Sequence, residues 1–429
     1  MNRKLLACSI LAAALSTSAA HAQTTLNGGG SSLAFPTYTA EFAAYTQAHP
    51  TIKFSYAAVG SGSGQTAFLT NNITLFSSPP AGTQTYGTIV GSQVDFGASD
   101  AFLIASQLTN PATGSYGTST VGSAVDGPLI QVPTFGVPIT LAYNEPGASS
   151  LTLSDTQLCG VLSGKITDWN LLDPSIPAGT TIDVVYFSNS SGTTFLTTQH
   201  LNAVCNLSNS SFPVLPVPIT THFVASTGGV FTSSNVPPNF IGANASSGVS
   251  TALLNTTNSI GYLSPDYTSI APHSLNTTSL PVASLINSID GKAYQPTVAN
   301  TTLGLANPDP DNSTNAKPPG NPTAAMDPLN WIPTIAQTLK GYPIVGYSTL
   351  ELSSCYADAA AGTSLEAFLK AEYSTASYKT IITTNGFVPL TNSAAAPYVK
   401  TVEAVFLSNN SKDGLNIDNK KLCAGYAGR

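Results

Sequence analysis

A short apolar run that leads through a Ser/Gly turn into helical spacing is the clearest local pattern in this chain. Residues Ile182 to Phe187 are mostly β-branched or aromatic, which predicts a buried strand. The run ends in Ser188 to Gly192, and helical spacing resumes at Thr193. The sequence therefore predicts a strand, a turn and the start of a helix in this stretch.

The same alternation of strand-like and helix-like segments recurs along the chain. Strands are predicted at residues 52–58, 94–98 and 260–263, and helices at residues 38–45, 65–69, 248–254, 364–373 and 397–406. Segments 72–92, 206–239 and 307–322 show neither periodicity and predict irregular loops. Alternating strands and helices predict an α/β fold whose ligand cleft lies beyond the carboxyl ends of the strands.

Two extended apolar runs, at residues 132–143 and 342–352, predict crossovers between two lobes. Lobe I is expected to contain residues 23–136 and 344–429, and lobe II residues 137–343. The predicted architecture is two α/β domains joined by two crossover strands, with the ligand cleft between them. Ser154 and Gln157 have the spacing of a capping box, which predicts that a helix begins between them.

Charged residues make up only 8% of the chain, against about 25% in typical proteins, while hydrophobic residues make up 42%. This composition argues against disorder. The net charge of −7 becomes −9 when Arg3 and Lys4 are removed with a leader segment, and such an acidic surface predicts no binding to nucleic acid. Few titrating groups suit a protein that works outside the cell or in acid.

The N-terminal segment has the three parts of a secretory signal. Arg3 and Lys4 precede the apolar residues 5–15, and Ala20 and Ala22 form a cleavage site, which predicts removal of residues 1–22. A lipoprotein signal ending at Cys8 is disfavoured, because almost no apolar region would precede it. No later run is long enough to span a bilayer, so we expect an exported, soluble protein.

Four cysteines remain after the leader, and in an exported chain they predict two disulfides with three possible connectivities. They are Cys159, Cys205, Cys355 and Cys423. A metal site is the alternative, but the sequence has no C-x-x-C pair or histidine cluster to support one. We therefore expect structural cysteines, no metal and no cofactor.

The turn before Thr193 has the chemistry of an oxyanion site. A helix start leaves several backbone N–H groups unpaired and carries partial positive charge. The hydroxyls of Ser191, Thr193 and Thr194 add donors. The simpler alternative is that Ser191 only caps the helix.

The segment Gly60 to Gly64 is predicted to form a Gly/Ser turn, either an anion-binding nest or a plain flexible turn. It matches neither the dinucleotide motif, because of Gln65, nor the hydrolase motif, because of Gly62.

The four histidines of the expected mature chain are scattered, and none adjoins a nucleophile-like turn. They are His49, His200, His222 and His273. We therefore predict no catalytic residues and a protein that is not an enzyme. A hydrolase whose triad forms only in space remains the alternative.

Several short motifs, in order, resemble those of periplasmic phosphate-binding proteins of ABC transporters, and most closely the DING branch. The motifs that carry the resemblance are Gly28–Leu33, Gly60–Gly64, Val94–Asp100, Leu158–Val161, Ser163–Ile166, Ser191–Thr194, Gly341–Ile344 and Phe387–Leu390, together with the cysteine spacing. The resemblance covers nearly the whole mature chain. It implies the two-lobed type II binding-protein fold and a monomer, periplasmic or secreted, that serves an ABC permease.

The resemblance also implies a phosphate site and a cysteine pairing. The matching ligand positions are Ser32, Leu33, Ser61, Asp100, Ser191, Gly192 and Thr193. In the family, the aspartate accepts a proton from phosphate, which excludes proton-free sulfate; the alternative for Asp100 is a helix cap. The implied disulfides are Cys159–Cys205 and Cys355–Cys423.

The chain departs from the family at one ion pair. Phe187 stands at the position of a family arginine, and Asn189 at the position of its acidic partner. Arg429 is the only arginine outside the predicted leader. We expect phosphate or a related oxyanion to bind with altered affinity and a preference for the monoanion. The alternatives are another small polar ligand, such as a neutral polyol, or a structural or adhesive protein that has lost its ligand.

Overall fold

The computed structural model describes residues 23–109, 127–205, 217–276, 279–311, 313–314, 325–390, 399–409, 411 and 414–429. The predicted leader, residues 1–22, lies outside this set, as does most of the predicted loop at residues 307–322. None of the helices in the described part has the length and apolarity needed to cross a membrane.

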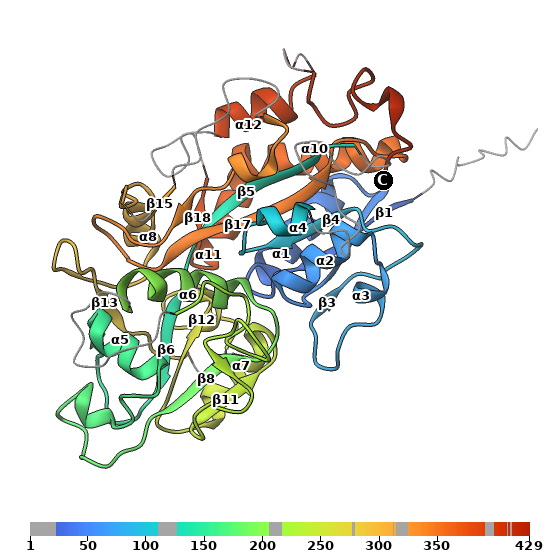
Figure 1. Cartoon of the computed structure of the whole chain (residues 1–429). Helices are drawn as coiled ribbons and strands as arrows, with labels where there is room; N and C mark the ends of the chain where they lie inside the picture. Colours follow the sequence, from blue (N-terminus) through green and yellow to red (C-terminus); the bar gives the residue numbers. More distant parts are fainter. Residues whose placement is uncertain are drawn as a thin grey trace, which may run out of the picture.

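Two large sheets form the cores of two α/β lobes (Figure 1). The first sheet has seven strands in the order β18 (Val388–Pro389), β5 (Leu129–Pro138), β17 (Val345–Ser353), β4 (Phe96–Ser99), β1 (Thr24–Gly30), β2 (Ile52–Ala57) and β3 (Thr85–Tyr86). The second has four, in the order β11 (Phe240–Ala243), β8 (Asp183–Phe187), β12 (Ser259–Leu263) and β6 (Thr140–Asn144). The two-lobed α/β fold expected from the sequence is therefore present.

Three smaller sheets complete the described strands. They pair β14 (Ala293–Tyr294), β13 (Ser284–Ile286) and β7 (Thr152–Leu153); β10 (Phe231–Thr232) and β9 (Val224–Ala225); and β15 (Ser313–Thr314) and β16 (Thr334–Ile335).

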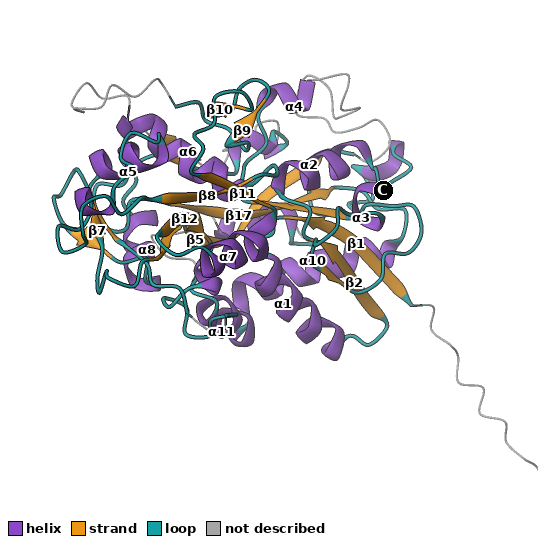
Figure 2. Cartoon of the chain, turned by 90° about the horizontal axis from the view of Figure 1, so that it is seen from below, coloured by secondary structure: helices purple, strands orange, loops and turns teal. Residues whose placement is uncertain are grey.

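Helices lie on both sides of the strands; α2 and α6 are on one side, and α1, α7 and α11 on the other (Figure 2). The α-helices are α1 (Phe35–Ala48), α2 (Ser61–Thr70), α3 (Thr74–Ser77), α4 (Ala105–Thr109), α5 (Asp155–Leu162), α6 (Gly192–Cys205), α7 (Ala245–Asn255), α8 (Val298–Leu305), α10 (Ala359–Ser374), α11 (Ala376–Thr384) and α12 (Val399–Phe406). Short 3-10 helices are η2 (Trp169–Leu171), η3 (Pro265–Tyr267), η4 (Pro328–Asn330) and η5 (Cys423–Gly425).

The chain crosses between the two large sheets in adjacent segments. Only Ile139 separates the end of β5 in the first sheet from the start of β6 in the second. Its amide donates to the carbonyl of Ile344, at 3.0 Å, immediately before β17 re-enters the first sheet. The run at residues 132–143 thus passes from the first large sheet into the second, and the run at residues 342–352 enters the first sheet as β17. The lobe boundaries proposed from the sequence remain a prediction.

Aromatic side chains fill the space between α1 and the first sheet. The rings of Phe42 and Phe54 stack with centroids 4.3 Å apart, and Phe96 and Phe368 pack against them. Each buried phenylalanine contributes about 1.5–3 kcal/mol to stability. This core fixes α1 against the strands whose ends carry the candidate site.

The structure contains two disulfides among the described residues, one in each half of the fold. Cys159 at α5 is bonded to Cys205 at the end of α6, and Cys355 after β17 is bonded to Cys423. This is the pairing that the family resemblance implies.

Several local predictions were wrong. The predicted turn at residues 60–64 is mostly helix, because α2 already begins at Ser61. Gly60, with φ +92°, makes the turn in a single residue. The loops predicted at residues 72–92, 206–239 and 307–322 also contain short elements, which are α3 and β3, β9 and β10, and β15, respectively.

Candidate functional site

Three parallel strands end at the same edge of the first sheet and bring separate sequence motifs together. Strands β1, β2 and β4 run parallel and end at Gly30, Ala57 and Ser99. Ser31, Ser61 and Asp100 follow these ends. Such an edge is where ligands bind in α/β folds.

Asp100 is buried at the centre of this edge. Its Oδ2 accepts a hydrogen bond from the hydroxyl of Ser31 at 2.6 Å and a longer one from that of Ser61 at 3.4 Å. Burial raises the pKa of Asp100 to about 6, against the lowering effect of the hydroxyls of Ser31, Ser348 and Ser61. Its Oδ1 is buried and has no hydrogen-bond partner among the described residues. A buried oxygen of this kind requires a donor, which a bound ligand can supply.

Helix α6 approaches Asp100 from the second sheet. A Cβ atom placed on Gly192 would lie 2.5 Å from Oγ of Ser61 and 2.8 Å from Oδ2 of Asp100, so only glycine fits there. The first residues of α6 and α2 therefore lie beside one carboxyl group. Helix N-termini of this kind bind oxyanions.

Other contacts hold the two halves of the cluster together. The hydroxyl of Ser32 accepts a hydrogen bond from the amide of Ser246 in α7 at 3.1 Å. A Cβ atom on Gly62 would lie 2.0 Å from Oγ of Ser190, so this glycine also permits close approach. Segments that follow strands of both large sheets thus lie side by side at one site.

The remaining predicted residues contribute in different ways. The hydroxyl of Ser191 accepts from the amide of Thr194 at 3.2 Å, so it caps α6, the simpler role considered from the sequence. Thr193 is buried beside Gly192. Leu33 is also buried, and it has only backbone groups to offer a polar ligand.

Several residues at the site are not among those predicted from the sequence. Ser31 bonds Asp100 directly, and Asp266 in η3 and Glu351 in β17 are buried carboxyl groups that interact electrostatically with it. A signal was present: Asp266 follows a predicted strand as Asp100 does, and Glu351 interrupts an apolar run in a chain with few charges.

Phe187 and Asn189 have structural contacts of their own. The Phe187 ring is fully buried and stacks on Tyr262, with centroids 5.5 Å apart. Oδ1 of Asn189 accepts from the amide of Ala245 at 3.0 Å, at the start of α7. Aromatic packing and a helix-end contact therefore occupy the positions that the family gives to an ion pair.

Arg429 lies at the other end of β4 from Asp100. Its Nη1 donates to the carbonyls of Phe68 and Val94, and its Nε to the hydroxyl of Ser353. Val94 precedes β4, whereas Asp100 follows it. This guanidinium therefore does not replace the family arginine.

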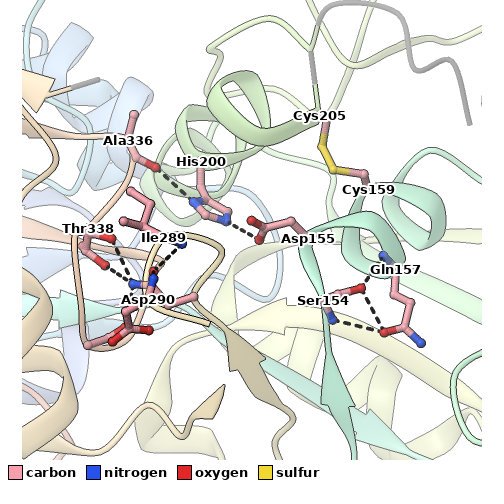
Figure 3. A network of polar contacts seen from close by, with 12 residues as sticks. Ser154, Asp155, Gln157, Cys159, His200, Cys205, Ile289, Asp290, Ala336 and Thr338 are labelled. Atoms are coloured by element: carbon pink, nitrogen blue, oxygen red, sulfur yellow. Dashed lines mark hydrogen bonds and ion pairs between the residues drawn. A yellow bond between two sulfur atoms is a disulfide. The ribbon is translucent and has the colours of Figure 1, made fainter. Parts of the chain in front are cut away.

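His200 forms part of a buried structural network (Figure 3). Its Nδ1 lies 3.0 Å from the carbonyl of Ala336, and its Nε2 lies 3.2 Å from Oδ1 of Asp155. Burial acts to raise the pKa of Asp155, but the hydrogen bond and charge of His200 lower it overall. The Cys159–Cys205 disulfide joins the same two helices (Figure 3). Both ring nitrogens are occupied, so neither can activate a nucleophile.

The other described histidines make their contacts with residues other than Asp100. His49 packs on Tyr45, and Nδ1 of His222 lies 3.1 Å from the hydroxyl of Thr221. Within the described ranges, no three His, Cys, Asp or Glu side chains are grouped closely enough to hold a metal ion.

A hollow of about 240 Å³ adjoins the cluster. Its walls continue the segments of the candidate site: Gly62 follows Ser61, Ala101 follows Asp100, and Phe195 belongs to the first turn of α6. The lining residues carry no charge; they are Gly62, Gln65, Ala101, Phe102, Ile104, Gln107, Phe195, Ile219, Thr220 and Thr221.

Comparison with known proteins adds a family context to this geometry. A model described as the PBP superfamily domain matches residues 16–307. A curated protein from Pseudomonas aeruginosa named alkaline phosphatase L is 32% identical over 98% of each chain.

The chain is also similar to solved structures of phosphate-binding proteins. PfluDING, a high-affinity periplasmic phosphate-binding protein with phosphate bound at pH 8.5, is 30% identical, with a TM-score of 0.72 over 95% of this chain and 99% of its own. The phosphate-binding protein from Stenotrophomonas maltophilia is 29% identical, with a TM-score of 0.71 over 95% of this chain and 100% of its own. The similarity extends over nearly the whole length of the chain.

Proposed function

Because the chain belongs to the PBP superfamily, and within it to the periplasmic phosphate-binding proteins closest to the DING branch, we propose that it binds inorganic phosphate between its lobes. The observation that carries the proposal is the buried Oδ1 of Asp100. It lacks a hydrogen-bond partner among the described residues, and the first residues of α2 and α6 lie beside the other oxygen of the same carboxyl group.

The chemistry of the cluster suits a protonated oxyanion. Amides and hydroxyls at Ser61, Gly192 and Thr193 offer donors to phosphate oxygens, as does the backbone around Ser32 and Leu33. Asp100 supplies an acceptor for a phosphate hydroxyl. Sulfate at neutral pH has no proton to donate, so it would leave this buried acceptor unpaired, and phosphate would bind more tightly.

Family membership also supports a role in phosphate uptake. In this proposal the leader directs export, it is cleaved after Ala22, and the mature protein acts as a monomer in the periplasm or outside the cell. Delivery to an ABC permease would follow the role of related binding proteins. The uncharged pair Phe187 and Asn189 supports an affinity that differs from that of arginine-containing relatives.

Equilibrium dialysis of the purified protein against labelled phosphate tests the proposal. One phosphate should bind per chain, and excess unlabelled phosphate should displace it far better than excess sulfate. Equal displacement by the two anions would contradict the role of Asp100. Absence of binding would favour the alternative of a structural or adhesive protein that has lost its ligand.

A second candidate is hydrolysis of phosphate esters. Two observations favour it: relatives carry the name alkaline phosphatase L, and the uncharged hollow beside Asp100 has room for an organic substituent. An assay with p-nitrophenyl phosphate discriminates between the two functions. Turnover that Asp100→Asn abolishes would support a phosphatase, whereas competitive displacement of phosphate without turnover would support a binding protein.

A further inference from the structure

Asp100 belongs to a group of three buried carboxyls. Asp266 and Glu351 are both fully buried, and each has one oxygen without a hydrogen-bond partner among the described residues. Burial raises the pKa of each to about 8, and the charge of Asp100 adds to both effects. Burial also raises the pKa of Tyr56 well above its ordinary value, and the charge of Asp100 raises it further, so Tyr56 stays neutral. The surroundings of Asp100 therefore oppose further negative charge.

The same surroundings offer little positive charge in return. The groups that lower the pKa of Asp100 are three serine hydroxyls, and none of them is a cation. The Arg429 guanidinium makes its hydrogen bonds beyond the opposite end of β4, and the stacked Phe187 ring occupies the position of the family arginine. Among the described residues, the groups placed to compensate for a bound anion are amides, hydroxyls and helix dipoles.

The buried carboxyls and the shortage of positive charge determine how many protons the complex with phosphate holds. A doubly charged phosphate beside an ionised Asp100 would place three negative charges together in a buried site. One additional proton reduces that number to two. It has a place to lie, because Oδ1 of Asp100 is buried and has no hydrogen-bond partner among the described residues.

We propose that phosphate binding is coupled to proton uptake, so that bound phosphate and Asp100 together hold one proton more than free hydrogen phosphate and an ionised Asp100. This inference rests on the proposed function. The balance is HPO4²⁻ plus the Asp100 carboxylate plus H⁺ from solvent, giving either dihydrogen phosphate beside a carboxylate or hydrogen phosphate beside a neutral acid. No covalent bond changes, and both forms have the same charge.

The coupling predicts a maximum in affinity at weakly acid to neutral pH. Above the second ionisation of phosphate, each unit of pH should weaken binding about tenfold, because one proton must be taken up. Below the pKa of Asp100, about 6, binding should weaken again, because a proton must leave. Calorimetric titration with inorganic phosphate from about pH 5 to pH 8.5 measures this profile.

Titrations at pH 8 in two buffers with different ionisation enthalpies count the proton directly. The proposal predicts uptake of about one proton per phosphate. Constant or tighter binding up to pH 8.5 without proton uptake would overturn the proposal and leave phosphate binding intact. Absence of binding at every pH would overturn the proposed function and this proposal with it.

A double variant tests the electrostatic cause. Phe187→Arg with Asn189→Asp adds a cation, and the aspartate keeps an acceptor for the amide of Ala245. Proton uptake at pH 8 should fall toward zero, and affinity there should rise about ten- to a hundredfold. The control, Phe187→Leu with Asn189→Asp, removes the ring without adding a cation and should retain the uptake. Equal uptake in both folded variants would contradict the electrostatic cause. If the arginine variant does not fold, the proton count of the natural chain still decides.

Discussion

Two buried glutamates, one from each end of the chain, should make this protein less stable as the pH rises. Glu41 in α1 and Glu372 in α10 are fully buried and interact with each other. None of their four oxygens accepts a hydrogen bond from another described residue. Two carboxylates have no donor to share, so at least one must carry a proton in the folded state. Burial raises the pKa of both groups, and their mutual interaction raises that of Glu41 further.

The direction of the effect follows from proton linkage. The folded chain holds a proton that the unfolded chain releases above the ordinary glutamate pKa of 4.5. The contribution of the pair is therefore fully present below pH 4.5 and is lost as the pH rises toward the raised folded-state values. One retained proton lowers the free energy of unfolding by about 1.4 kcal/mol per pH unit, or about 2.7 kcal/mol between pH 5 and pH 7.

Glu372→Gln should remove this dependence, because the amide of glutamine can donate to an ionised Glu41. Between pH 5 and pH 7, the free energy of unfolding should fall with pH less steeply in the variant than in the natural chain. The difference between the two slopes should be about 1.4 kcal/mol per pH unit. Urea denaturation followed by fluorescence of the buried Trp169 and Trp331 gives these values. The control is Glu403→Gln on α12, which should preserve the natural slope. Parallel pH profiles for Glu372→Gln and the natural chain would refute the reasoning.

Three further predictions concern the site and the disulfides. Asp100→Asn should reduce discrimination between phosphate and sulfate in competition dialysis, since asparagine adds a donor, whereas Asp311→Asn at an exposed position should not; equal weakening of both anions would mean that Asp100 is only structural. Gly192→Ala should weaken phosphate binding about ten- to a hundredfold, because its methyl group would collide with Ser61 and Asp100; unchanged affinity would place the ligand elsewhere. Replacing Cys159 and Cys205 together by serine should lower the free energy of unfolding by about 4 kcal/mol for the 46-residue loop, and an unchanged urea midpoint would contradict this.

The long periodic elements were predictable because local physics dominates there. The run at 182–187 became β8, the helix resuming at Thr193 became part of α6, and the capping box at Ser154 opens α5 as expected. The two extended runs became the long strands β5 and β17, which are buried along their whole length, and β5 leads directly into β6 of the second sheet.

Tertiary contacts decided what the sequence did not show. Helix α2 begins at Ser61 although two glycines follow within three residues, because its first turn packs against Ser190 and Asp100. Asp266 and Glu351 are more than 160 residues from Asp100 in the chain, so only the folded arrangement of β4, β17 and η3 brings the carboxyls together. Local pattern therefore located the donors of the site, and the fold supplied its electrostatics.

The most direct test of the account is a crystal structure of the protein grown with phosphate at about pH 6.5, the region of highest expected affinity. The account predicts one phosphate between Asp100 and the N-termini of α2 and α6. One of its oxygens should lie within hydrogen-bond distance of Oδ1 of Asp100, about 2.5–2.7 Å. Phosphate bound at another place, or an Asp100 Oδ1 that contacts only protein in the saturated complex, would contradict it.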